Sequence, residues 1–535
     1  MIRTLLAALL LTSSAAAQDY DLVIRNAKIL DGAGNPWVRG DVAVKGDRIA
    51  KLGVVAGKGA REIDARGRFV SPGFIDMMDQ SGGVLRKNGA AENKLRMGVT
   101  TVIAGEGGIP VDADQANDYF AQLETQGIAV NFGSYYSAAQ ARVKVMGDAA
   151  GTPNAVQMEQ MKREVETAMR AGTFGISTAL IYPPNSFQTT EDLIELAKIV
   201  SRCDGFYSTH MRDESSKLVE AVNEAIAIGE KGGVKVEIFH LKAAYAPQFG
   251  KLMPKAVAAI DAARKRGVDV AADLYPYTAG GTGLSIVIPN WVFEKGAKEG
   301  VELLQDPAVR ARVKREVAAG SQPGWSNLVE ASGGWSRIVL ANPFNEKYER
   351  FRGKNIAEIA KALGKDPIDA AIDITVEALP NRAMALFFMM DERDIATALR
   401  QSWTSIGSDA AASLGAGQTD VLGLPHPRSY GTFPRVLAEY VKKRGVLTLE
   451  DAVRKMTSWP ASRMGLEGRG VLREGLYADL VMFDLDKIDD RASWTNPTAS
   501  PVGIDLVVVN GAVTIEDGNA TTARGGKVLR HACKS

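Results

Sequence analysis

Apolar and polar residues alternate differently in the middle of this chain and at its two ends. The middle holds eight short apolar runs, at 69–76, 100–105, 129–133, 173–178, 205–210, 234–240, 268–273 and 404–409. Most of these runs are followed by a helical stretch, and residues 156–171 and 190–202 show the 3.6-residue apolar period of a helix. Strands that alternate with helices form a parallel sheet, so eight such units predict a closed (β/α)₈ TIM-like barrel.

Both ends of the chain carry β patterns instead. Short apolar stretches at 20–24, 28–30, 40–44 and 48–52 are separated by turn residues. Near the C-terminus, residues 479–483 and 504–509 are apolar runs, and the second ends at Asn510-Gly511, a hairpin signal. We therefore expect residues 18–66 and 466–535 to form one small β-sandwich domain beside a barrel at 67–465.

A long segment separates the seventh predicted strand from the eighth. A connection of this length without secondary structure is implausible in a compact domain. We predict a mostly helical insertion at 284–400 that lies over the C-terminal face of the barrel. Such an insertion would act as a lid over the substrate.

The first 17 residues have the pattern of a secretory signal. Arg3 precedes an apolar stretch at 5–11, and small residues at 13–17 satisfy an A-x-A cleavage rule. The stretch is too short to span a bilayer, which takes about 20 residues. We expect a cleaved signal peptide at 1–17 and a secreted or periplasmic protein; a buried N-terminal helix is the alternative.

Composition narrows the class of partner. The 535 residues carry a formal net charge of +1, with 46% hydrophobic and 24% charged residues, which is typical of a globular protein. No basic cluster indicates nucleic acid or a membrane surface. Cys203 and Cys533 lack metal-site spacing, and a disulfide between them is possible but not required. The expected partner is a small-molecule substrate.

Histidine placement indicates a metal site. Catalytic groups of (β/α)₈ enzymes lie at the C-terminal ends of strands. Only four histidines occur, and two of them, His210 and His240, end consecutive predicted strands. Neighbouring strands lie about 5 Å apart, so both imidazoles can share one ion, and Glu106 at the end of the second run would complete the set. Two His and one Glu with an open fourth position are typical of catalytic Zn²⁺.

Asp409 ends the eighth predicted strand, across the barrel mouth from the histidines. It is placed to take a proton from a metal-activated water (a metal lowers the pKa of water to about 7) and to pass it to a leaving group. The alternative is that Asp409 only caps the following helix. Tyr275 or Gln80 would donate a hydrogen bond to the oxyanion.

Motifs along nearly the whole mature chain carry a resemblance. They are Val70–Asp76, Gly98–Gly105, Thr209–Arg212, His240–Lys242, Tyr275–Thr278, Ile406–Asp409, His426–Leu437, Gly468–Gly470, Ala478–Val481 and Val509–Gly511. In this order they resemble the amidohydrolase superfamily, and within it the N-acyl-D-amino-acid deacylase, or D-aminoacylase-like, group. The resemblance implies metal-dependent hydrolysis of a C–N bond in an N-acyl amino acid, a dipeptide-like amide or a cyclic amide.

The same resemblance implies that the substrate bears a carboxylate. Lys242, Tyr277 and Arg428 stand at the matching positions, where Arg428 would grip the carboxylate with two donors and Lys242 would add a point charge. A structural ion pair or hydrogen bond is the alternative for each. Arg212 and Glu214, just after His210, are weaker candidates.

Two departures from the family pattern bear on the number of metal ions. The His-x-His motif of the family is replaced by Met78 and Gln80, and Gly107 stands where the family has a cysteine ligand. Some N-acetylglucosamine-6-phosphate deacetylases hold one metal ion with one Glu and two His ligands. By analogy, this resemblance implies one metal at Glu106, His210 and His240, with Gln80 bonded to water or substrate. A second metal would need another ligand, such as Asp76 or Asp79.

Three alternatives stay open from the sequence. The same site suits an ester, a lactone or a carbamate. The loss of His-x-His also fits a degenerate homologue that only binds a ligand, although a binding protein has no need of Asp409. Zinc is the expected metal, and manganese or iron would fit the same ligands.

Overall fold

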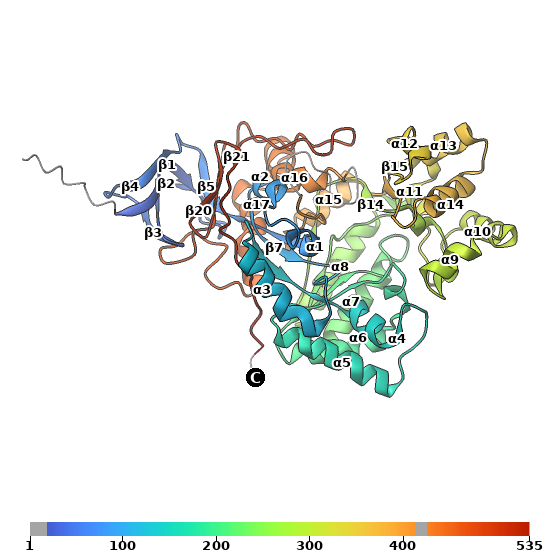
Figure 1. The fold of residues 1–535 in the computed structure, drawn as a ribbon. Coiled ribbons are helices and arrows are strands. Elements are labelled where there is room, and N and C mark those ends of the chain that lie inside the picture. Colours follow the sequence, from blue (N-terminus) through green and yellow to red (C-terminus); the bar gives the residue numbers. More distant parts are fainter. Residues whose placement is uncertain (1–18, 414–424, 534–535) are drawn as a thin grey trace, which may run out of the picture.

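The computed structural model describes residues 19–413 and 425–533. It shows a central barrel, a β-rich domain on one side and a lobe on the other (Figure 1). The signal peptide expected at 1–17 lies outside the described residues.

The central barrel has a parallel strand at each of the eight apolar runs. The strands pair in two parallel sets, β6-β7-β8 and β9-β10-β11-β12-β13-β17, with β9 at Tyr136–Ser137, and a parallel bridge from Asp79 to Ala410 brings the last strand back to the first. The eight strands are β6 (Phe74–Asp79), β7 (Val99–Ala104), β8 (Asn131–Ser134), β10 (Gly175–Ala179), β11 (Phe206–His210), β12 (Lys235–Ile238), β13 (Val270–Leu274) and β17 (Thr404–Ile406). The predicted (β/α)₈ barrel is confirmed.

Helices cover the outside of the barrel, as the apolar periods predict. They include α5 (Ala155–Arg170), α6 (Thr190–Ser201), α7 (Leu218–Gly232) and α8 (Leu252–Lys265). Asn154 and Thr189 begin α5 and α6 with reciprocal capping boxes, in which side chains satisfy the first free N–H groups. The ends of these two helices therefore follow the local sequence closely.

Both ends of the chain share one nine-stranded sheet, and its central contact is the antiparallel pair of β5 (Phe69–Pro72) with β18 (Leu480–Phe483). The other strands are β1 (Tyr20–Ile29), β2 (Val38–Lys45), β3 (Arg48–Gly53), β4 (Gly59–Asp64), β19 (Ile504–Val509), β20 (Ala512–Glu516) and β21 (Asn519–Ala520). β1 is one strand where two were expected, because a bulge at Asn26, with φ 57°, carries the chain across the gap. Asn510 and Gly511, with φ of 47° and 80°, make the predicted hairpin turn.

The inserted lobe is more mixed than the sequence predicted. Its helices are α9 (Ala297–Leu303), α10 (Pro307–Ala319), α11 (Leu328–Ser332), α12 (Glu346–Glu349), α13 (Ile356–Leu363) and α14 (Pro367–Glu377). They surround a three-stranded antiparallel sheet of β14 (Gly280–Gly283), β16 (Met384–Phe387) and β15 (Ile338–Asn342). The sequence did not predict this sheet, because β14 consists mostly of glycine and shows no alternation of apolar and polar residues. α15 (Glu392–Leu399) packs on α8 and β17, so it belongs to the barrel rather than to the lobe.

The C-terminal segment runs back along the barrel. Cys533 forms a disulfide with Cys203, and the His531 ring lies 2.7 Å from the Cys203 carbonyl oxygen through Nε2. Within 19–413 and 425–533, no helix has both the length and the apolar character needed to cross a bilayer.

Candidate active site

Three potential metal ligands converge at the C-terminal ends of neighbouring barrel strands. Glu106 follows β7, His210 ends β11 and His240 follows β12. Glu106 Oε1 lies 2.5 Å from His210 Nδ1 and 2.9 Å from His240 Nε2. One ligand atom from each residue lies within 4.8 Å of the others, and both imidazoles are buried. The structure therefore brings together the three side chains that the sequence predicts as metal ligands.

Two residues of the site have a backbone that few non-glycine residues adopt. His240 and Asp409 have φ of 36° and 49°. The first is held by a 2.9 Å hydrogen bond from its N–H to Asp273 Oδ1, and the second by a 2.8 Å bond from its N–H to the Met78 carbonyl. Such conformations cost about 1–3 kcal/mol and cluster at functional sites. Here they turn both side chains at the point where their strands end.

Glu214 and Lys242 lie behind the histidines. Lys242 Nζ lies 2.6 Å from Glu214 Oε1 and 2.6 Å from His240 Nδ1. Glu214 also lies 3.4 Å from His210 Nε2 and 3.1 Å from His240 Nδ1. Glu214 thus contacts both imidazoles on the side away from Glu106. Carboxylates in this place orient ligating histidines and raise their basicity.

The charged groups of this cluster shift one another's pKa values. Burial and Lys242 lower the pKa of His240, but Asp409, Glu214 and Glu106 outweigh them and raise it to about 10. Burial alone would raise the pKa of Glu106, but His210 and His240 hold it well below its usual range. The carboxylate and the imidazoles thus favour a positive charge between them, as a proton or a cation. One oxygen and two nitrogen donors suit zinc, so the residues present fit a divalent metal.

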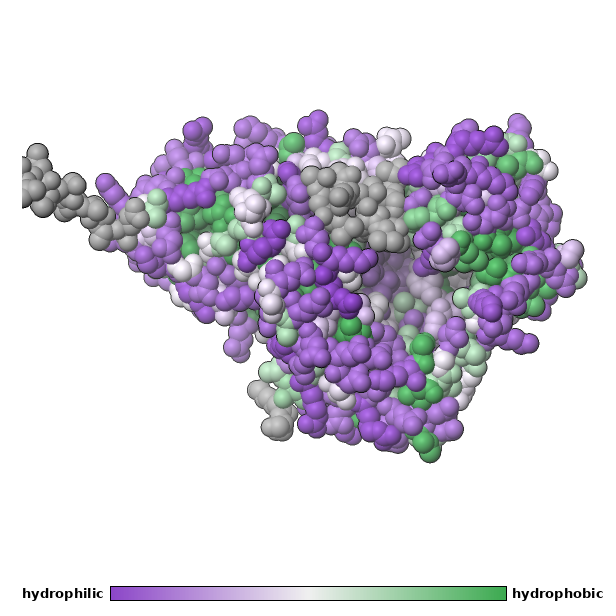
Figure 2. Space-filling view, in the orientation of Figure 1, coloured by the Kyte–Doolittle hydropathy of each residue, from purple (hydrophilic) through white to green (hydrophobic). Residues whose placement is uncertain are grey.

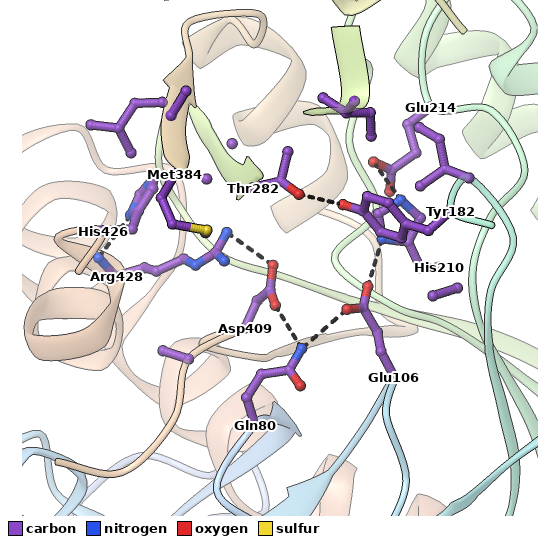
Figure 3. A pocket seen from close by; sticks show the side chains of 18 of the residues that line it. Gln80, Glu106, Tyr182, His210, Glu214, Thr282, Met384, Asp409, His426 and Arg428 are labelled. Atoms are coloured by element: carbon purple, nitrogen blue, oxygen red, sulfur yellow. Dashed lines mark hydrogen bonds and ion pairs between the residues drawn. The ribbon is translucent and has the colours of Figure 1, made fainter. Parts of the chain in front are cut away.

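Gln80 and Arg428 fix the carboxylate of Asp409 from two sides (Figure 3). Gln80 Nε2 donates to Asp409 Oδ1 over 3.2 Å and to Glu106 Oε2 over 3.1 Å. Arg428 Nη1 lies 2.9 Å from Asp409 Oδ2, which is 4.0 Å from His240 Nε2. Gln80 therefore links Asp409 to Glu106 through its side-chain amide.

The carboxylates expected for a second metal are already engaged. Lys94 Nζ lies 2.8 Å from Asp76 Oδ2 and 2.8 Å from Asp79 Oδ2, and all three side chains are fully buried. Neither aspartate lines the active-site cavity. Met78, at one of the family's His positions, is buried as well.

The site opens into a cavity of about 580 Å³ between the barrel and the lobe. Six residues predicted from the sequence as site residues line it together with His210, namely Gln80, Glu106, Lys242, Tyr275, Asp409 and Arg428. Burial raises the pKa of Tyr275 above its usual value, so its hydroxyl stays protonated and available as a donor. His240 lies directly behind this wall and is buried.

Some sequence predictions are placed elsewhere by the structure. Tyr277 is not among the residues that line the cavity; its hydroxyl lies 3.4 Å from Asp490 Oδ2 and 3.5 Å from the Pro427 carbonyl. Arg212 pairs with Glu224 instead of facing the site. Lys242 and Arg428 do face it, but each is already paired with a carboxylate of the protein.

Sequence patterns did not single out the wall contributed by loops and by the lobe. Tyr182 packs on His210 with ring centroids 5.2 Å apart, and its hydroxyl lies 2.9 Å from Thr282 Oγ1. Arg382, just before β16, completes this wall. These residues do not lie at the C-terminal ends of barrel strands. The expectation that catalytic groups lie at those strand ends therefore could not identify them.

The chain is similar to known proteins over most of its length. The profile of the amidohydrolase family matches residues 61–515. A D-aminoacylase of Alcaligenes xylosoxydans xylosoxydans is 34% identical, with 97% of this chain and 99% of that protein aligned.

Two solved structures are similar over nearly the whole length. An N-acyl-D-glutamate deacylase of Bordetella bronchiseptica, solved with zinc and a phosphonate mimic of the tetrahedral intermediate, is 30% identical, with a TM-score of 0.79 and 96% and 99% of the two chains covered. A D-aminoacylase whose binuclear centre is described by one-metal activation and second-metal attenuation is 32% identical, with a TM-score of 0.79 and 96% and 100% covered.

Proposed function

The chain belongs to the amidohydrolase family, and from that membership we propose that it is an N-acyl-D-amino-acid deacylase that uses one divalent metal ion. Its relatives establish a metal-dependent hydrolase of amide bonds, and the D configuration follows the names of those relatives. The observation that carries the proposal is the convergence of Glu106, His210 and His240 beside Asp409, at the mouth of a closed barrel.

A single metal ion suits the ligands that this chain offers. Bound by Glu106, His210 and His240, a divalent ion would supply Lewis-acid activation of a water molecule and of the substrate carbonyl. Zinc is the first choice for two imidazoles and a carboxylate, and the Bordetella relative contains it. Within residues 19–413 and 425–533, Glu106, His210 and His240 form the one candidate ligand set, and Asp76 and Asp79 are both paired with Lys94.

Asp409 is the residue placed to move the proton. Gln80 and Arg428 hold its carboxylate 4.0 Å from His240 Nε2, next to the ligand cluster. Asp409 takes a proton from the attacking water and gives it to the amide nitrogen as the C–N bond breaks, so that a carboxylic acid and an amine leave. The protonated hydroxyl of Tyr275 donates to the carbonyl oxygen as negative charge develops there.

Arg428 and Lys242 are the proposed partners of the substrate carboxylate. A guanidinium offers five N–H donors, and Arg428 Nη1 lies 2.9 Å from Asp409 Oδ2. Its ring contact with Tyr275, at 4.7 Å, keeps the guanidinium plane beside the cavity. A substrate carboxylate would share Arg428 with Asp409, which links substrate binding to the position of the proton carrier.

We also propose that the protein acts outside the cytoplasm. The pattern at 1–17 is that of a signal peptide, and disulfides such as Cys203–Cys533 persist in oxidising compartments. The mass of the protein recovered from a periplasmic extract tests this: a chain beginning near Gln18 is expected, and an intact N-terminus in the cytoplasm would contradict it.

The substrate class is tested with matched compounds on zinc-loaded protein. N-acetyl-D-leucine is expected to release leucine, whereas N-acetyl-L-leucine and the ester analogue of the D compound should react far more slowly. Faster cleavage of the ester would replace the deacylase by an esterase. No turnover of any compound, with metal fully loaded, would favour a ligand-binding homologue.

A further inference from the structure

A second cavity adjoins the active-site cavity on the side of the lobe. It measures about 840 Å³ and is the larger of the two. Both cavities are lined by Ile181, Tyr182, Ile286 and Arg382, so these side chains form a wall common to the two. We call the second cavity the tail chamber. About 300–1,000 Å³ is the usual size of a ligand pocket, and the tail chamber lies within that range.

The tail chamber differs from the active-site cavity in the chemistry of its walls. Apolar side chains from the loop after β10, the 3₁₀ helix η5 (Asn290–Phe293), α9 and the turn before β16 make up most of it, including Ile288, Phe293, Val301, Leu304, Leu379 and Pro380. Figure 2 shows apolar residues gathered on the lobe beside the hollow. Leu379, on this wall, is 51% exposed.

The wall shared by the two cavities begins one side chain away from the proposed metal ligands. Tyr182 packs on His210, and its hydroxyl meets Thr282, which also accepts a 3.2 Å hydrogen bond from Arg382 Nη2. The Arg382 guanidinium lies 5.3 Å from the Tyr182 ring centre. Gly283 makes this arrangement possible, because a Cβ at that position would collide with Arg382 Nε.

We propose that the tail chamber binds the acyl chain of the substrate, and that the enzyme prefers N-acyl amino acids with acyl chains of medium to long length. Since the two cavities share four lining side chains, an occupant that extends from one into the other is the substrate itself. Lys242 and Arg428 line the active-site cavity but not the tail chamber, so the carboxylate half of the substrate stays beside them. The apolar half is then the part that passes Tyr182. The inference rests on the proposed deacylase function.

Chain length gives the direct test. Each buried methylene strengthens binding by about fourfold, from a transfer free energy of about 0.8 kcal/mol. We expect kcat/KM for N-octanoyl-D-leucine to exceed that for N-acetyl-D-leucine by at least about tenfold, since burial of six methylenes is incomplete in practice. Equal values for the two substrates would overturn the proposal and leave the deacylase function intact.

A variant that fills the chamber localises the effect. Val301 lines the tail chamber and not the active-site cavity, so Val301→Trp should lower kcat/KM for the octanoyl substrate by about tenfold or more and leave the acetyl substrate unchanged. Val156→Trp, at a site 68% exposed on α5, is the matched control and should change neither. An equal loss on both substrates, or no loss on either, would contradict the proposal.

Two further outcomes separate the tail chamber from the deacylase function. If Val301→Trp changes the preference between N-acetyl-D-leucine and N-acetyl-D-alanine but not the preference for acyl length, the chamber takes the amino-acid side chain and the acyl assignment is wrong. If neither substrate is hydrolysed, the deacylase function fails. Calorimetry on zinc-loaded protein then tests whether the tail chamber binds the acyl chain. The proposal requires that the octanoyl compound binds more tightly than the acetyl compound, and that Val301→Trp abolishes this difference in affinity.

Discussion

Two buried charge clusters lie at the C-terminal end of the barrel, and they are built differently. In one, Lys94 lies between Asp76 and Asp79 at 2.8 Å from each, and its Nζ also donates to Ser408 Oγ and to the Ala410 carbonyl. In the other, Glu106, His210 and His240 converge on one point, and Glu106 and His210 line a cavity of about 580 Å³. The first cluster is closed and the second is open.

The difference separates a structural cluster from the one that we propose to be catalytic. Lys94 uses its donors on groups of the protein, which ties the first strand to the loop that presents Asp409. In the open cluster, a carboxylate oxygen of Glu106 lies 2.5 Å from His210 Nδ1 and 2.9 Å from His240 Nε2. Burial of ionisable groups is thus shared by both, and only the open one has donor atoms directed at a common point beside a cavity.

The largest effect is expected at Asp409, the proposed proton carrier beside the open cluster. Asp409→Asn keeps the shape of the side chain and removes its basicity, so kcat should fall by about 10³-fold while metal content and fold remain. Steady-state kinetics on the acyl substrate and elemental analysis measure both. Asp204→Asn, at a side chain 80% exposed, is the matched control and should keep full activity. Near-normal turnover by the Asp409 variant would remove the role assigned to it.

A substitution in the closed cluster should lower the free energy of unfolding. Lys94→Met leaves two buried carboxylates without their cation, which should lower the free energy of unfolding by about 3–5 kcal/mol in urea titrations. Lys198→Met removes an exposed ion pair on α6 and should cost less than about 1 kcal/mol. Equal losses in the two variants would mean that Lys94 is not the support of this part of the barrel.

Protons and metal should compete in the open cluster. In chelator-treated protein the carboxylates raise the pKa of His240 from 6.5 to about 10, so its contribution to stability is full below pH 6.5 and is lost as the pH rises towards 10. Between pH 6.5 and about 9 the loss is on the order of 3 kcal/mol, measured by urea unfolding at each pH. Metal-loaded protein and a chelator-treated His240→Asn variant should both lack this dependence. The same slope in all three would place its origin elsewhere.

Gln80 should have the smallest effect of the four. Gln80→Ala removes the hydrogen bonds to Glu106 and Asp409 but no ligand, so activity should fall by about 10–100-fold with the metal retained. Gln115→Ala, at an exposed position before α3 (Ala116–Gln126), should change nothing. Loss of the metal in the Gln80 variant would make Gln80 a ligand rather than a positioning residue.

The sequence predicted the open cluster because strand ends and rare residues coincide there. The chain has four histidines, and two of them end consecutive strands, which leaves few other places for a metal. Catalytic groups of (β/α)₈ barrels lie at the C-terminal ends of strands, so these side chains were expected at the barrel mouth. The eight strands were found because buried strands of a parallel barrel are continuous apolar runs. Asp409 and Gln80 followed from the same positions.

The lobe and the partners of the charged residues did not follow from the sequence. β14 is Gly280–Gly283, whose glycines carry no apolar period, although the lack of a side chain at Gly283 is what admits Arg382. Tyr277 matched a family position but turns to Asp490 because its neighbours there come from the distant β-rich domain. Pairings such as Lys242 with Glu214 depend on side-chain packing, which periodicity does not encode.

Metal content of the purified mature protein tests the central claim most directly, measured by elemental analysis beside a His210→Ala/His240→Ala double variant. One zinc per chain that is absent from the double variant is the expected result, because Glu106 alone cannot retain the ion. Two ions per chain, or one ion that survives in the double variant, would contradict a single site at Glu106, His210 and His240.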